Sequence, residues 1–242
     1  MESYESFTAT VSAPAPAYRP SPAHRVGETY DELAVGYDDY HVDNKSLAEN
    51  RFVAGRIAAR IDASTSVLDV GCGTGLLLDL IDIPPDRYLG VDVSEGMLQR
   101  AKKKHPHHRF VTADAQRMSS DLGRFDLVVS LFGSPSYCAL GSFARSVQRV
   151  QAPKGGHFLM YCGPRYMKRS TYINKSTKLL KSYASPELRE AYPGSRTWGL
   201  SFLVDIAPKS LPAPVMRGLL GWDARTVGRL APDACFFVIV ER

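Results

Sequence analysis

The sequence predicts an α/β fold built on a doubly wound, mostly parallel sheet of seven strands. Short apolar runs alternate with segments of helical spacing, which is the pattern of a parallel sheet covered on both faces. A glycine-rich turn connects the first apolar run, residues 67–70, to a helix-like segment that begins at Leu76. Asp92 ends the second run about 20 residues later, at the sheet edge where such folds bind a ligand.

Each expected strand and helix has its own signal. Apolar runs of strand length occupy residues 67–70, 87–93, 109–113, 125–131 and 157–161, residues 198–204 give a weaker sixth, and 235–240 form the last. Helical spacing appears in residues 50–61, 76–80, 95–104 and 141–150 and in the later part of 211–230. Ser94 is a suitable N-cap for the helix 95–104, whose last turn holds three lysines.

The glycine-rich turn reads Asp69-x-Gly71-x-Gly73-x-Gly75. Glycines allow a sharp turn and let a ligand approach the backbone without a Cβ in the way. The spacing differs from the dinucleotide pattern G-x-G-x-x-G, and the acid two residues before the first glycine favours a cationic or donor-rich ligand over a pyrophosphate. The alternative is a glycine-rich turn that arose by chance.

This turn resembles the first motif, E/D-x-G-x-G-x-G, of the class I S-adenosylmethionine-dependent methyltransferases of the small-molecule type. Later segments resemble that family in order, including Phe-Asp-x-Val at the start of the run 125–131. The resemblance covers roughly residues 27–161 and the last strand. It implies S-adenosylmethionine as cofactor and a last strand that runs antiparallel to the others.

The resemblance also implies which residues bind the cofactor. Asp92 would bond the ribose hydroxyls, Met97 would face the adenine, Asp114 would bond the adenine amino group, and Ser130 would lie near the sulfonium. Tyr30 and Tyr37 would cover the methionyl end. The full set of expected cofactor contacts comprises Tyr30, Tyr37, Asp69, Gly71, Cys72, Gly73, Gly75, Asp92, Val93, Met97, Asp114, Ala115 and Ser130.

The chain is expected to form a flexible tail, residues 1–24, and a single methyltransferase domain, residues 25–242. Four prolines between residues 14 and 22 exclude regular structure from the tail. Residues 25–50 resemble the "Y-D-x-x-A-x-x-Y-D" segment with which family members cover the cofactor, so we expect an N-terminal lid. Two alternatives stay open: the tyrosines pack a surface helix, and the tail docks on a partner subunit of a homodimer.

The residues that handle the acceptor are less clearly marked. Tyr137 lies in the loop after the fourth strand, which faces the acceptor in this fold, and His41 follows the lid tyrosines; these two are the candidates for catalysis. Ser134-Pro135-Ser136-Tyr137 loosely resembles the N/D-P-P-Y motif of amine-directed nucleic-acid methyltransferases, but a structural turn is favoured. The expected substrate contacts are Tyr40, Phe132, Tyr161, Arg165 and Tyr166.

Residues 163–196 are too long for a simple connection, so we expect a substrate-specificity insertion. Residues 161–200 hold eight basic and two acidic residues, whereas the rest of the chain is nearly neutral. Three interpretations stay open: a lid over a small aromatic or anionic acceptor, an RNA-facing patch, and a solvated basic helix. We favour the small acceptor because the chain has no separate RNA-binding module.

Composition narrows the class of protein. The chain has 242 residues, 44% of them hydrophobic and 23% charged, and no apolar run approaches the length of a membrane span. Its N-terminus lacks the pattern of a signal peptide. The four cysteines, Cys72, Cys138, Cys162 and Cys235, have no metal-ligand spacing, so we expect no metal and a reduced cytoplasmic protein.

Together these signals predict an enzyme that moves a methyl group from S-adenosylmethionine to an N, O or C atom of a small, natural-product-like acceptor. Two alternatives are an RNA methyltransferase that uses the basic 161–200 region and a non-catalytic S-adenosylmethionine-binding scaffold subunit. The expected partners are a small-molecule acceptor and a second copy of the chain in a homodimer. We expect no membrane association, and a nucleic-acid partner is not favoured.

Overall fold

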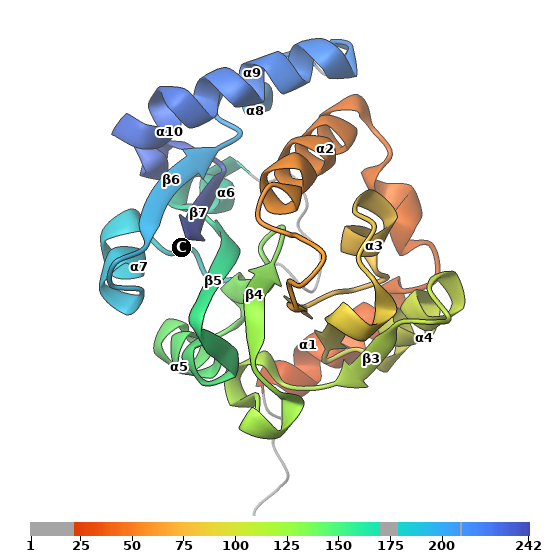
Figure 1. Cartoon of the computed structure of the whole chain (residues 1–242). Coiled ribbons are helices and arrows are strands. Elements are labelled where there is room, and N and C mark those ends of the chain that lie inside the picture. The colour runs from red at the N-terminus through yellow and green to blue at the C-terminus, as the bar shows by residue number, and fades with distance from the viewer. Residues whose placement is uncertain (1–21, 170–178, 209) are drawn as a thin grey trace, which may run out of the picture.

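The structure, a computed structural model, describes residues 22–169, 179–208 and 210–242. Its centre is a seven-stranded sheet with the order β3-β2-β1-β4-β5-β7-β6 (Figure 1). Strands β1 to β5 pair in parallel, and β7 runs antiparallel to its neighbours β5 and β6. The expected α/β fold with a doubly wound sheet and an antiparallel last strand is confirmed.

The strands are β1 (Val67–Val70), β2 (Tyr88–Asp92), β3 (Arg109–Thr112), β4 (Phe125–Ser130), β5 (Gln151–Cys162), β6 (Arg196–Leu200) and β7 (Phe237–Glu241). The α-helices are α1 (Pro22–Leu33), α2 (Asn44–Ala58), α3 (Leu76–Leu80), α4 (Glu95–Lys104), α5 (Leu140–Val150), α6 (Pro164–Arg169), α7 (Ser185–Ala191), α8 (Leu203–Ile206), α9 (Ala213–Arg225) and α10 (Val227–Leu230). Short 3₁₀ turns include η1 (Tyr37–His41), η3 (Ala115–Arg117) and η5 (Ser134–Tyr137).

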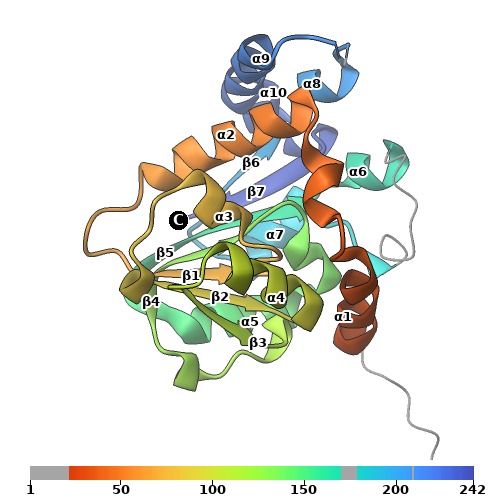
Figure 2. The ribbon, with the colours of Figure 1, turned by 90° about the vertical axis from the view of Figure 1, so that its right-hand side faces the viewer.

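Each face of the sheet has its own apolar core. On one face, α2, α3, α4 and α9 contribute buried side chains such as Ile57, Leu77 and Leu220. On the other face, α5 and α7 contribute Phe143 and Leu188. Figures 1 and 2 show α2 and α9 on one side of the strands and α5 on the other. The alternating strands and helices of the sequence therefore produce a three-layered domain.

Element boundaries differ from expectation where local geometry intervenes. β5 begins at Gln151 rather than near residue 157, because its first residues pair with β4 across a register shift between Phe125 and Leu127. β6 ends at Leu200 because Ser201 adopts a left-handed φ of 69°. α2 begins at Asn44, where Asp43 accepts a capping hydrogen bond from the Ser46 N–H.

The expected tail lies outside the described residues except for Pro22, Ala23 and His24, which begin α1. The expected lid, residues 25–50, comprises most of α1, the turn η1 and the start of α2. Of the expected insertion, residues 163–196, positions 170–178 lie outside the described part, and α6 and α7 flank them. Within the described residues, no helix is both long and apolar enough to cross a membrane.

Candidate functional site

A cavity of about 150 Å³ lies at the carboxyl edge of the parallel strands, beside the glycine turn. Segments far apart in the sequence meet around it: α1, the loop after β1, the end of β2, the residues after β3 and the loop after β4. This is the edge at which open α/β sheets bind ligands. Most of the expected cofactor residues line this cavity, namely Tyr30, Tyr37, Asp69, Gly71, Cys72, Gly73, Asp92, Val93, Met97, Asp114 and Ala115.

The three glycines of the turn all have left-handed backbones, with φ values of 72° at Gly71, 54° at Gly73 and 91° at Gly75. A Cβ at Gly71 would lie 2.7 Å from the Cβ of Ser134. A Cβ at Gly73 would meet nothing within 4 Å, so the backbone there is open for a ligand to approach. Gly75 does not line the cavity; it precedes α3 and packs closely against His105.

Asp92 organises the turn. Its two carboxylate oxygens accept hydrogen bonds from the Gly73 N–H and the Ser94 N–H, both at 2.9 Å. Burial raises its pKa, whereas these backbone donors oppose that rise. Each carboxylate oxygen retains a lone pair for a further donor, and the side chain lines the cavity.

Asp69, at the end of β1, is almost completely buried and accepts a hydrogen bond from the Tyr88 hydroxyl at 2.9 Å. Burial, with a smaller contribution from the nearby Asp92, raises its pKa to about 7, and the hydrogen bond from Tyr88 opposes this rise. A cation in the same cavity would favour the ionised form of this carboxyl.

Met97, in the first turn of α4, is buried and lines the cavity. Asp114 caps η3 by accepting from the Gln116 N–H at 2.9 Å, which orients the carboxylate beside Ala115. An apolar thioether and a fixed carboxylate therefore border one pocket, a combination that fits a purine with an exocyclic amino group.

Three of the tyrosines that line the cavity, Tyr30, Tyr37 and Tyr137, contact one another. The hydroxyls of Tyr30 and Tyr137 lie 2.9 Å apart, and the Tyr30 ring contacts both Tyr137 and Tyr37 edge to face. Burial raises the pKa of Tyr37, and Tyr137 and Asp92 raise it further. Tyr37 is therefore a neutral phenol at physiological pH.

The aspartates that follow the lid tyrosines fasten the lid, and their role was not predicted. Asp31 accepts from the Ser94 hydroxyl at 2.6 Å and from the Gly96 N–H at 2.8 Å, at the start of α4. Asp38 accepts from the Thr74 hydroxyl at 2.5 Å, in the glycine turn. Each Tyr-Asp pair thus places a ring at the cavity, while Asp31 binds at the N-terminus of α4 and Asp38 binds the glycine turn. The feature of the sequence that could have indicated this role is the Tyr-Asp dipeptide, which occurs twice in the lid.

The loop after β4 forms the wall beside these rings. Phe132 lines the cavity with a φ of 46°, an unusual backbone conformation for a bulky residue. Such strain occurs preferentially at functional sites. Ser134 and Cys138 also line the cavity and were not predicted, because nothing in the local pattern S-P-S-Y says which side chains turn inward.

Several expected site residues do not reach the cavity. The Ser130 hydroxyl donates to the Val70 carbonyl at 2.7 Å. Tyr161 is fully buried in the core on the α5 face, where its hydroxyl lies 2.7 Å from that of Tyr192. Adjacent strand residues point to opposite faces, and Tyr161 points away from the α2 side. The side chains of Tyr40 and His41 lie outside the described part of the structure.

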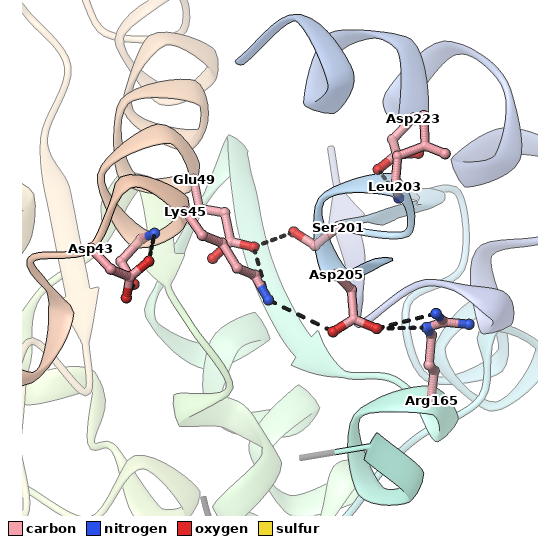
Figure 3. Close-up of polar contacts among 9 residues, drawn as sticks. Asp43, Lys45, Glu49, Arg165, Ser201, Leu203, Asp205 and Asp223 are labelled. Carbon is pink, nitrogen blue, oxygen red and sulfur yellow. Dashed lines mark hydrogen bonds and ion pairs between the residues drawn. The ribbon is translucent and has the colours of Figure 1, made fainter. Parts of the chain in front are cut away.

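Arg165 and Tyr166 follow β5, but neither lines the cavity. Arg165 pairs with Asp205 of α8 at 3.1 Å, and Lys45 of α2 approaches the other oxygen of that carboxylate at 3.8 Å. Figure 3 shows the two cations on either side of Asp205, with the buried Glu49 and Ser201 beside them. Tyr166 packs on Phe236, with ring centroids 4.5 Å apart.

The expected basic region of residues 161–200 is only partly described, because Lys175 and Lys178 lie outside. Two of its described cations have carboxylate partners: Arg165 pairs with Asp205, and Arg196 approaches Glu241 at 3.9 Å. These pairs offset the charge of Arg165 and, at the longer distance, part of that of Arg196. Among the described residues, no group of three or more His, Cys, Asp or Glu side chains could hold a metal ion.

Comparison with known proteins adds independent observations. A family model described as a methyltransferase domain matches residues 67–155. A ubiquinone/menaquinone biosynthesis C-methyltransferase of Campylobacter jejuni is 30% identical over 174 residues, which cover 60% of this chain and 71% of the relative. A demethylmenaquinone methyltransferase of Chlorobaculum tepidum is 30% identical over 143 residues, covering 56% and 55%. The chain spans about half the length of several curated relatives that it matches.

Solved structures agree on the fold. A protein from Thermotoga maritima, described as a possible histamine N-methyltransferase, superposes with a TM-score of 0.59 at 13% identity, covering 89% of this chain and 98% of that one. A TehB-like methyltransferase from Corynebacterium glutamicum gives a TM-score of 0.52 at 16% identity, covering 91% and 98%. At these identities the likeness concerns architecture and not the acceptor.

Proposed function

Because the chain belongs to the class I S-adenosylmethionine-dependent methyltransferases, with S-adenosylmethionine as cofactor, we propose that it methylates an N, O or C atom of a small, natural-product-like acceptor. The observation that carries this proposal is that the open glycine turn, two fixed carboxylates and a tyrosine group meet in one cavity. When bound, the cofactor supplies a methyl group that is already activated by its positively charged sulfur.

The residues of the cavity divide into two groups under this proposal. Asp92 accepts from the ribose hydroxyls, while Met97, Asp114 and Ala115 hold the adenine. Asp69, whose pKa burial raises to about 7, faces the positive charge of the amino acid end and is held ionised by it. These contacts orient the cofactor, and orientation of two reactants alone can supply several kcal/mol of rate acceleration.

Tyr30 and Tyr37, which we expect to cover the methionyl end of the cofactor, together with Tyr137 and Phe132 form the end of the cavity that the acceptor would enter. Their rings exclude water and leave an aromatic wall that suits a flat, largely apolar acceptor. Two relatives named as quinone-pathway methyltransferases support the same class of acceptor. An anionic acceptor held by Arg165 is less favoured, because that guanidinium already pairs with Asp205.

The paired hydroxyls of Tyr30 and Tyr137 are the polar groups of this aromatic end. The hydrogen bond with Tyr30 holds the Tyr137 hydroxyl in place. We propose that Tyr137 in turn orients the polar group of the acceptor that lies next to the reacting atom. His41 stays a second candidate from the sequence. The four cysteines are all free and buried thiols, which supports a reducing compartment such as the cytoplasm. A homodimer through the N-terminal tail also stays a proposal.

A product assay tests the proposed reaction. The full chain is incubated with S-adenosylmethionine and a panel of phenols, quinols and aromatic amines, and S-adenosylhomocysteine formation is measured. We expect turnover of at least one flat acceptor and a loss of about tenfold or more in kcat/KM for Tyr137→Phe, since one oriented hydrogen bond is removed. Phe143→Leu, a change in the core on the far face, serves as the control for folding.

Binding of the cofactor without turnover of any acceptor would favour the non-catalytic scaffold. Turnover of RNA but not of small acceptors would favour the nucleic-acid alternative. Equal kcat/KM for Tyr137→Phe and the parent chain would contradict the role of Tyr137 while leaving the reaction intact.

A further inference from the structure

A second cavity lies on the α2 and α9 face, at the edge of the sheet opposite the cofactor cavity. Its walls come from α2, from the beginning of β6, and from α9 and α10, and they include Phe52, Arg56, Arg196, Trp198, Arg225 and Arg229. α2 packs against α9, and Figure 1 shows α9 above β6 with α2 to the right. β6 lies parallel to β5, so its first residue, Arg196, lies at the amino edge of the sheet.

Four arginines from four different elements therefore surround one hollow of about 150 Å³, which we call the arginine cavity. Like charges gathered in this way repel one another unless a counter-charge is present. The recorded counter-charge is the buried carboxylate of Glu241, which pairs with Arg56 at 3.2 Å, with Arg60 outside the cavity at 2.7 Å, and more distantly with Arg196.

This carboxylate does not balance the cluster. Arg225 and Arg229 form no ion pair with any residue that the structure describes. One carboxylate thus serves two guanidinium groups of the cavity and one beside it, while two further guanidinium groups of the cavity lack a partner among the described residues. The cavity therefore has a local excess of positive charge.

The wall also holds donors that the described protein does not satisfy. The Nε of Arg56 and the Nε1 of Trp198 are buried and have no hydrogen-bond partner. The Arg56 guanidinium lies over the Trp198 ring, 4.8 Å from its centroid, so the indole fixes one cation in position. The exposed guanidinium groups of Arg225 and Arg229 lack acceptors among the described residues, and a bound oxyanion supplies them.

We propose that the arginine cavity binds a phosphate-bearing small molecule. Guanidinium groups match phosphate oxygens in a bidentate geometry, and four of them suit a phosphoryl or diphosphoryl group better than a single carboxylate. Phe52 and Trp198 add an apolar border for the organic part of the ligand. The site is separate from the cofactor cavity, so its occupant is a ligand other than the cofactor or the acceptor.

Trp198 provides the readout. The chain contains two tryptophans, and Trp222→Phe removes the half-exposed one, so that the remaining emission reports on the arginine cavity. The full chain with this change is titrated with inorganic phosphate, pyrophosphate and ADP at 150 mM salt. We expect saturable quenching, with pyrophosphate tighter than phosphate; a further gain with ADP would show that the organic part is also recognised.

Two double variants distinguish binding at the arginine cavity from general attraction to surface charge. Arg225→Gln with Arg229→Gln removes two cations from the cavity. Arg51→Gln with Arg217→Gln removes two exposed cations from α2 and α9 outside it. We expect pyrophosphate affinity to fall at least tenfold in the first double variant and less than twofold in the second, with unchanged melting temperature and unchanged binding of S-adenosylhomocysteine in both.

Equal weakening in the two double variants would overturn the proposal, because it would indicate a general surface charge. Absence of saturable binding of any of the three probes would overturn it as well. So would tight binding of a short single-stranded RNA that both double variants weaken equally. None of these outcomes depends on methyl transfer, so they do not bear on the proposed function.

Discussion

The half of the sheet that carries the glycine turn and the half that carries the C-terminal helices are built by different means. Around β1 and β2, the backbone itself forms the site: three left-handed glycines and hydrogen bonds from N–H groups to Asp92. Around β6 and β7, side-chain charges join the elements, as Figure 3 shows for Lys45, Asp205 and Arg165. Backbone-built sites leave a pattern in contiguous sequence, and charge-built contacts between distant segments do not.

The largest effect that would test this contrast is expected from Gly71→Ala. The change places a Cβ at a left-handed φ of 72° and 2.7 Å from Ser134. Left-handed backbone costs roughly 1–2 kcal/mol and the overlap about 1–3 kcal/mol. We expect a drop of that summed size in the free energy of unfolding, measured by urea denaturation, and loss of cofactor binding. Gly73→Ala, where the Cβ meets open space, should show only the smaller backbone cost.

If Gly71→Ala and Gly73→Ala were equally mild, close packing of the turn against the loop after β4 would not matter for the site.

The next effect concerns pH and Asp69. Burial raises the pKa of this carboxyl to about 7 in the folded chain, whereas in the unfolded chain it titrates near its ordinary value of about 4. Between these values the folded state holds a proton that the unfolded state has released, so stability falls as pH rises from about 4 to 7 and levels off above. We expect a contribution on the order of 2–4 kcal/mol, and a flatter stability profile for Asp69→Asn.

Binding of the cationic cofactor favours the ionised form of Asp69. We therefore also expect affinity for the cofactor to rise as pH increases towards 7. Identical stability profiles for Asp69→Asn and the parent chain would contradict the assignment. The buried Glu49, Asp92 and Asp223 also have raised pKa values, so Asp69→Asn should reduce the slope rather than abolish it.

Asp92→Ala sharpens the comparison within the cofactor half. The change removes the acceptor of the Gly73 N–H and the proposed acceptor of the ribose hydroxyls. We expect S-adenosylhomocysteine to bind more weakly by roughly 1–3 kcal/mol, the size of lost charge-assisted hydrogen bonds. Asp92→Asn keeps one acceptor oxygen and should lose less. Calorimetry on a folded Asp92→Ala chain with unchanged affinity would refute this role.

The smallest effect is expected in the other half, from Gly218→Ala. Gly218 lies within α9, and a Cβ there would meet nothing within 4 Å. Alanine is a better helix former than glycine, so the change should stabilise the chain by roughly 0.5–1 kcal/mol. Thermal unfolding measures it directly. Destabilisation by Gly218→Ala would contradict the expectation that a Cβ fits at this position of α9 without a clash.

The sequence predicted the fold and many of the residues that line the cavity at the glycine turn, and the reasons are visible in single residues. Gly71, Asp92, Met97 and Asp114 lie at fixed places after successive strands, and topology brings strand ends together. Positions that depend on side-chain direction were harder to predict. Ser130 turns to the Val70 carbonyl, and Tyr161 points to the far core.

The partners of charged side chains were also not predicted. Arg165 was expected at the pocket because it follows the fifth strand, but Asp205, forty residues later, engages it. Likewise, Asp31 and Asp38 could be read as part of the lid, but not as the groups that fasten it to α4 and the glycine turn. Only tertiary structure brings these partners together.

The most direct test of the central claim, that the cavity at the glycine turn holds S-adenosylmethionine, is calorimetric titration of the full chain. S-adenosylmethionine, S-adenosylhomocysteine and NADH are compared under the same conditions. The structure predicts micromolar binding of the two sulfur ligands and none of NADH, because the acid-led G-x-G-x-G turn disfavours a pyrophosphate. Binding of NADH without either sulfur ligand would contradict the account.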